Sequence, residues 1–161
     1  METTKNEYEN ENNRTSVIDT KVSIALPIIS GYFLAIAPMN NYKSIFSAKI
    51  LTFSDCIIPT LLFVTYSVSL ILALISVIDM VKVITTRAYN RLNPRDLYND
   101  NFMKYDERVL SIQLIKLYIN ATEKNKSVND NRIPLYKSGW LLTTISIISF
   151  VIYVIIKNFF T

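Results

Sequence analysis

The chain lacks, or nearly lacks, several residue types on which common protein chemistry depends. It has no His, a single Cys (Cys56) and two Gly in 161 residues. These absences exclude disulfide frameworks, thiolate and imidazole zinc sites, and Cys–His or Ser–His catalytic pairs. A glycine-rich phosphate loop is excluded too, because it needs several Gly within a few positions. We therefore expect no enzyme, no metal site and no cofactor.

Charge is missing from three long stretches of the chain. The longest is residues 56–78, which contains fourteen Leu, Ile, Val and Phe. As a helix this stretch spans about 35 Å, against a hydrocarbon core of about 30 Å. Residues 22–39 and 138–156 are also free of charge, and each would span about 27–28 Å as a helix. The sequence predicts an all-α membrane protein with three transmembrane helices.

The segments before and between these spans are polar. Residues 1–21 form an acidic N-terminal segment, and we expect disorder over much of residues 1–13. Residues 40–55 form a short external loop, in which Ser54 and Asp55 are suitable as a helix N-cap. An external tail, residues 157–161, follows the third span.

Residues 79–137 form a basic helical insert between the second and third spans. Residues 105–124 place apolar side chains at spacings of three and four, which predicts an amphipathic helix. Residues 125–132 are polar and predict a loop.

Orientation follows from the distribution of Lys and Arg. Three spans place residues 1–21 and 79–137 on one side of the membrane, and these segments hold fourteen Lys and Arg against three elsewhere. Basic residues favour the cytoplasmic side. The sequence therefore predicts a multi-pass protein with a cytoplasmic N-terminus and a cytoplasmic insert.

A basic band follows the second span, with Arg87, Arg91 and Arg95 beside Tyr89. Such a band commonly anchors a helix to anionic lipid head groups. The alternative is an anionic ligand site, because guanidinium donors form a planar fork that suits phosphate and tyrosine can stack on a base.

Two sets of residues are candidates for helix contacts. Gly31 and Ala35 in the first span, with Ser69 and Ala73 in the second, are small residues four apart that permit close helix packing, either within one subunit or in a homo-oligomer. At the inner ends of the spans, Asp19 and Lys21 are typical of a helix start with a lysine whose side chain reaches the membrane–water interface. Alternatively, Asp79 pairs with Lys21 or Lys82.

The order of parts resembles the Pycsar membrane effector family of bacterial anti-phage signalling. The matching residues are 18–24, IDTKVSI, at the entry to the first span, and 135–137, LYK, before the third. A second span, a basic exit and a helical insert lie between them in the same order.

This resemblance implies an effector in the bacterial inner membrane that responds to a cyclic pyrimidine mononucleotide made by a partner cyclase. The family's activity would be assembly and disruption of the lipid bilayer, which stops the cell from supporting phage growth. DNA and RNA are not among the expected partners. The alternatives are a holin-like pore that needs no ligand and a structural accessory subunit of a membrane complex.

Overall fold

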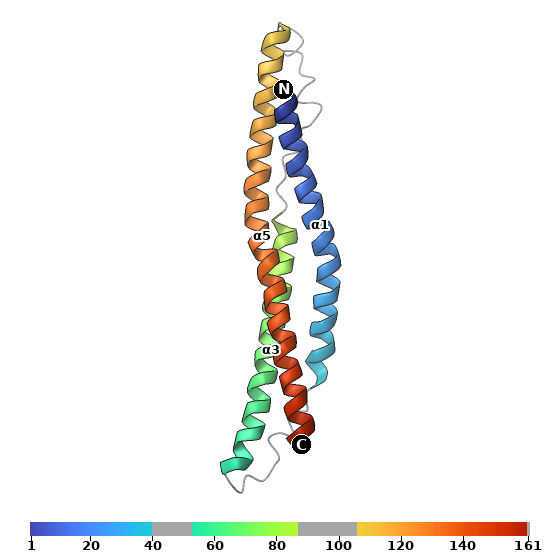
Figure 1. Cartoon of the computed structure of the whole chain (residues 1–161), viewed down its shortest axis with the longest axis vertical. Helices are drawn as coiled ribbons and strands as arrows, with labels where there is room; N and C mark the ends of the chain where they lie inside the picture. Colours follow the sequence, from blue (N-terminus) through green and yellow to red (C-terminus); the bar gives the residue numbers. More distant parts are fainter. Residues whose placement is uncertain (40–52, 87–105, 161) are drawn as a thin grey trace. The chain divides into compact units, whose positions relative to one another are not determined.

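A computed structural model describes residues 1–39, 53–86 and 106–160, and these contain no β-strand. They form the helices α1 (Glu2–Ile36), α3 (Phe53–Thr85) and α5 (Glu107–Phe160), with a short 3-10 turn, η1 (Ala37–Met39), after α1 (Figure 1). Each of the three α-helices is long and apolar enough to cross a membrane. The predicted all-α class and the three apolar spans are thereby confirmed.

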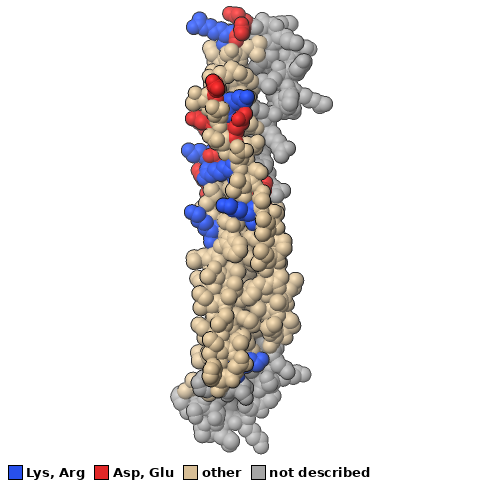
Figure 2. Space-filling model, turned by 45° about the vertical axis from the view of Figure 1, so that its right-hand side comes forward, with Lys and Arg blue, Asp and Glu red and all other residues tan. Residues whose placement is uncertain are grey.

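The chain divides into two compact units, to which all three helices contribute. The polar unit consists of Met1–Val22 and Val83–Pro134, and the apolar unit consists of Ser23–Lys82 and Leu135–Thr161. On the face drawn in Figure 2, the charged side chains gather over the polar unit, and most of the surface of the apolar unit carries none.

Each helix buries or half-buries a stripe of residues that are alternately four and three positions apart. This average spacing of 3.5 residues is typical of helices that pack as in a coiled coil. We call the stripe the seam. In α1 it comprises Thr15, Ile18, Val22, Ala25, Ile29, Tyr32 and Ile36. In α3 it comprises Leu62, Tyr66, Ser69, Ala73, Ser76, Met80 and Val83. In α5 it comprises Asn125, Asn129, Arg132, Tyr136, Gly139, Thr143, Ser146, Phe150 and Tyr153.

Contacts between the helices show in which direction each one runs. In the polar unit Tyr8 packs edge-on against Tyr118, and Thr15 bonds to Asn129 further along both helices, so α1 and α5 run parallel. In the apolar unit Ser69 contacts Ser146 while Ser76 contacts Gly139, so α3 and α5 run antiparallel. Alternating crossings of a membrane require this arrangement.

The apolar unit turns many large hydrophobic side chains outward, although Leu62, Tyr66 and Tyr153 form a buried cluster. Leu34 is 68% exposed and Leu141 is 62% exposed, whereas Ser69, Ser76 and Ser146 are completely buried. A protein surrounded by water has the opposite distribution. In hydrocarbon the distribution is favourable, because lipid tails accept apolar faces while small and hydroxyl residues hold the helices together.

The N-terminal segment is not disordered as expected, because α1 begins at Glu2. Its polar composition conceals the 3.5-residue spacing of Thr4, Tyr8, Glu11 and Thr15, which face the helix interface. Lys5 and Glu9 add an ion pair one turn apart at 3.7 Å. Packing on α5 therefore orders a segment whose composition alone predicts disorder.

The loop predicted for residues 125–132 is also wrong, because α5 continues through it as one helix of 54 residues. Asn125, Asn129 and Arg132 are buried seam residues, so their polarity serves an interface and does not mark a turn. The helix even accommodates Pro134, whose missing N–H leaves the Asp130 carbonyl without its helical donor. The part of the insert that the structure describes is thus continuous with the third span.

The start of α3 differs slightly from the prediction. Ser54 and Asp55 lie inside α3, which begins at Phe53, so they do not cap it. The second span continues past Ile78 to Thr85, as expected for a helix that leaves the membrane. Residues 87–105 lie outside the described residues.

The fold makes a testable prediction about topology. The start of α1, the end of α3 and the start of α5 belong to the same unit, so three crossings leave the two chain ends on opposite sides. With the Lys and Arg distribution, a reporter that works only in the cytoplasm should be active before Met1 and inactive after Thr161. The reporter is fused to the chain ends, because an insertion within the polar unit, for example at Asn125, would interrupt α5 at a buried residue. Activity at both ends would contradict the three-span topology.

Candidate functional site

The side chain of Arg132 is the most deeply buried charge in the described part of the polar unit. The exposed fraction of this side chain is 0%, and from its place in α5 it contacts both α1 and α3. Nε donates a hydrogen bond to the backbone oxygen of Val83 in α3 at 2.9 Å, and Nη2 forms a short ion pair with Asp19 Oδ1 in α1. We call this contact of three residues the arginine clasp.

The clasp is only partly satisfied. Arg132 Nη1 is buried and has no hydrogen-bond partner among the described residues. Leaving a buried donor unpaired costs about 1–3 kcal/mol, more when the group is charged. The Asp19 side chain is 26% exposed, so its carboxylate keeps some contact with solvent. The clasp therefore joins three helices without being as stable as a fully bonded pair.

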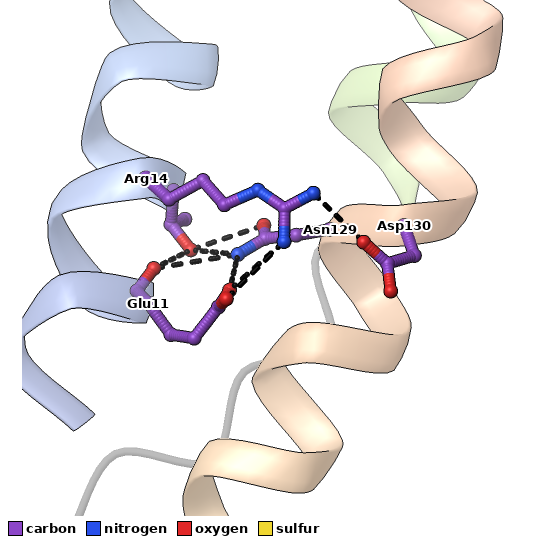
Figure 3. A network of polar contacts seen from close by, with 5 residues as sticks. Glu11, Arg14, Asn129 and Asp130 are labelled. Atoms are coloured by element: carbon purple, nitrogen blue, oxygen red, sulfur yellow. Dashed lines mark hydrogen bonds and ion pairs between the residues drawn. The ribbon is translucent and has the colours of Figure 1, made fainter. Parts of the chain in front are cut away.

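A second polar contact joins α1 to α5, where Glu11 and Arg14 of α1 lie next to Asn129 and Asp130 of α5 (Figure 3). Thr15 Oγ1 and Asn129 Oδ1 are 3.1 Å apart, and both residues are completely buried. Asn129 Nδ2 also donates to Glu11 Oε2 at 3.0 Å. The amide of Asn129 therefore has partners for both its oxygen and its nitrogen.

Arg14 closes this contact from the solvent side. Its guanidinium lies 2.7 Å from Asp130 Oδ1 and 3.2 Å from Glu11 Oε1. The hydrogen bond to Asp130, followed by the contact with Glu11, raises the pKa of Arg14 above its ordinary value despite the opposing effect of burial. Arg14 stays protonated, but the side chains of Arg14 and Asp130 are 36% and 51% exposed, so water competes for the pair.

Next to these contacts is an open groove of about 400 Å³. It is lined by Glu7, Asn10, Glu11, Ile119, Thr122, Glu123 and Lys126. Three glutamates against one lysine make this groove unfavourable for a phosphate group. Among the described residues, no group of three acidic, His or Cys side chains could hold a metal ion.

The structure separates the small residues that the sequence grouped together. Ser69 and Ala73 are completely buried in the seam. Gly31 and Ala35 face outward, and no atom lies within 4 Å of a Cβ built at Gly31. Their interpretation as a packing face within one subunit is therefore wrong. The homo-oligomer interpretation stays a prediction.

The charged candidates at the span ends also find other partners than expected. Asp19 pairs with Arg132, while Lys21 is exposed at the surface of the polar unit. Asp79 accepts a hydrogen bond from Ser138 Oγ at 2.8 Å, and the expected pair with Lys82 is not formed in the described part of the chain. The ligand candidates Arg87, Tyr89, Arg91 and Arg95 lie outside the described residues.

Sequence reasoning did not identify Arg132, because it assigned residues 125–132 to a loop. A signal was present, since Asn125, Asn129 and Arg132 continue the alternating spacing of Gly139, Thr143 and Ser146 toward the start of α5.

Comparison with protein-family models, curated proteins and solved structures gives no match for this chain.

Substitution of Arg132 and substitution of Arg14 should destabilise the contact between α1 and α5 to different degrees. Replacing Arg132 by Ala removes hydrogen bonds to charged groups, worth roughly 1.5–3 kcal/mol, so amide exchange in residues 1–22 should become about ten- to a hundredfold faster. Arg14→Ala is the matched control, because it removes an exposed Arg–Asp pair between the same helices. It should cost about 0.2–1 kcal/mol, less than roughly a sixfold change. Amide exchange is monitored by mass spectrometry. Equal acceleration of exchange in the two variants would contradict the role of the clasp.

Proposed function

We propose that the protein is a membrane effector of bacterial anti-phage defence. It assembles in the inner membrane, with its N-terminus in the cytoplasm, and permeabilises the membrane when a cyclic nucleotide binds its cytoplasmic part. The observation that carries this proposal is the contrast between the two units: one has an apolar surface suited to lipid, and the other is held together by exposed ion pairs and a partly satisfied clasp. The resemblance of residues 18–24 and 135–137 to the Pycsar membrane effectors supports the biological setting.

The polar unit is the regulatory part in this proposal. Hydrogen bonds between protein groups contribute only about 0.5–1.5 kcal/mol each, because water can replace the partner. An interface built from Glu11, Arg14, Thr15, Asn129 and Asp130 can therefore separate and reform at moderate cost. A ligand shifts such an equilibrium when it binds one of the two states more tightly. A holin-like pore without a ligand has no need for this unit.

The nucleotide binds the basic band of Arg87, Arg91 and Arg95 with Tyr89, in this proposal. The acidic groove of the polar unit would repel a phosphate group, which leaves the band as the better site. The partner cyclase supplies the nucleotide, and the lipid bilayer is the target.

Assembly into a homo-oligomer uses the outward face of α1. Gly31 and Ala35 are four positions apart on that face, and the open space around Gly31 lets another helix approach closely. This contact would join copies without disturbing the seam within each copy.

Dye release from lipid vesicles tests the proposed activity. Without nucleotide, vesicles of bacterial polar lipids that contain the purified protein should release little dye. Cyclic UMP or cyclic CMP added to the outside should increase the release strongly, because it reaches those molecules whose polar unit faces outward. Linear 5′-UMP is the control, because it carries the same base and a phosphate but lacks the ring. Release that is the same with and without the cyclic nucleotides would contradict a signal-dependent effector.

The basic band makes a separate prediction about the nucleotide concentration required. Loss of a charged hydrogen bond to phosphate costs roughly 1.5–3 kcal/mol, so Arg91→Ala should raise the half-maximal concentration about ten- to a hundredfold. Arg91→Lys should recover only part of this, because lysine keeps the charge and loses the planar fork. Lys116→Ala, which removes an exposed basic side chain of the polar unit, serves as the control. A lipid anchor would accept lysine at position 91 fully, and such a result would exclude the band as the nucleotide site.

A further inference from the structure

A row of hydroxyl groups lies inside the apolar unit, between α3 and α5. Ser69 Oγ donates a hydrogen bond to the backbone oxygen of Ser146 at 3.0 Å, and Ser146 Oγ donates to the backbone oxygen of Ser69 at 2.7 Å. Tyr32 brings a hydroxyl from α1 to within 3.3 Å of Ser69 Oγ and 3.2 Å of Ser146 Oγ. The three helices therefore meet at a polar centre.

The row continues between α3 and α5 in both directions. Ser76 Oγ donates to the backbone oxygen of Gly139 at 2.6 Å and lies 2.7 Å from Thr143 Oγ1. On the other side, Ser149 Oγ donates to the backbone oxygen of Thr65 at 2.9 Å. We call this set the hydroxyl row; its members are Tyr32, Ser69, Ser76, Thr143, Ser146 and Ser149.

The residues next to the row in the chain have the opposite character. Val68, Ile75 and Ile145 precede Ser69, Ser76 and Ser146, and they are 42%, 40% and 43% exposed, respectively. Contact with water is unfavourable for these apolar side chains. Water can instead replace each protein partner of a hydroxyl with little net loss. Water that enters the unit is therefore accepted by the hydroxyl row and not by the outward faces.

Given the proposed permeabilising function, on which this step rests, we infer that the hydroxyl row is the surface that faces water when the membrane becomes permeable. Helices α3 and α5 separate along the row, the hydroxyls exchange protein partners for water, and the apolar faces stay in lipid. Rows from several copies then line a path for ions and small hydrophilic molecules. In the closed unit the row has no contact with solvent at its centre, since Ser69 and Ser146 are completely buried.

A disulfide across the row tests this inference in the full-length chain. The variant combines Cys56→Ser, which removes the native cysteine, with Ser69→Cys and Ser146→Cys. After oxidation, release of dye in response to cyclic UMP or cyclic CMP should fall at least tenfold, and reduction should restore it. Single Ser69→Cys and Ser146→Cys variants, treated with the same oxidant, control for the substitutions themselves.

The outcomes separate this inference from the proposed function. If the parent protein releases dye and the oxidised pair does so equally, the hydroxyl row is not the path, although the protein remains a permeabilising effector. If the parent protein releases no dye with either nucleotide, the proposed function fails and the inference fails with it.

Labelling of single cysteines gives an answer even if the disulfide pair does not fold. In the Cys56→Ser background, a charged thiosulfonate that does not cross membranes should label Ser146→Cys at least tenfold faster after addition of the nucleotide. Labelling of Ile145→Cys, on the adjacent outward face, should not change. Faster labelling at position 145, or no change at position 146 while dye is released, would overturn the inference.

Discussion

A polar group inside hydrocarbon must find its hydrogen-bond partner within the protein, because the lipid offers none. The apolar unit is built around this constraint. Several of its hydroxyl side chains bond across the helix interface, as Ser69 and Ser146 do, and others bond back to the preceding turn, as Thr144 does to the oxygen of Trp140. The seam consequently holds buried hydroxyl groups beside its apolar residues, while the outside is apolar. Any motion that separates the helices therefore needs water to replace the lost hydrogen-bond partners.

The polar unit uses the same spacing for different chemistry. Asn129 and Arg132 occupy seam positions there, and Arg132 is completely buried, whereas Arg14 lies at the solvent edge. Breaking a buried pair by removing one partner is costly, whereas an exposed pair contributes little. The contact between α1 and α5 therefore depends more on Arg132 than on Arg14, although each pairs with an aspartate.

Composition was sufficient to predict the helical class and the three apolar spans, because a long run without charge has few alternatives to a membrane helix. The predictions that composition gave for the polar stretches were wrong. Residues 1–13 and 125–132 contain few apolar side chains, so each looked unable to bury enough surface to be ordered, yet they belong to helices that pack through Tyr8, Thr15 and Asn129. Gly31 and Ser69 illustrate a second limit: both are small, but only packing decides that one faces outward and the other inward. Pairing of Asp19 with Arg132 joins residues 113 positions apart, which no local pattern indicates.

The pairing of Asp19 with Arg132 also determines the register between α1 and α5. Several apolar seam residues of α1 tolerate a shift by one heptad, since Ile29 would take the place of Val22 and Ile36 the place of Ile29. Arg132 does not, because a shift by seven positions would place it opposite Asn12 or Leu26 instead of Asp19. Its charge would then be buried without a counter-ion, and Asp19 would lose its partner as well. A single polar seam residue can specify alignment in this way at some cost in stability. The same shift would break the buried hydrogen bond between Thr15 and Asn129, so Arg132 and Asn129 together select a single alignment of the two helices.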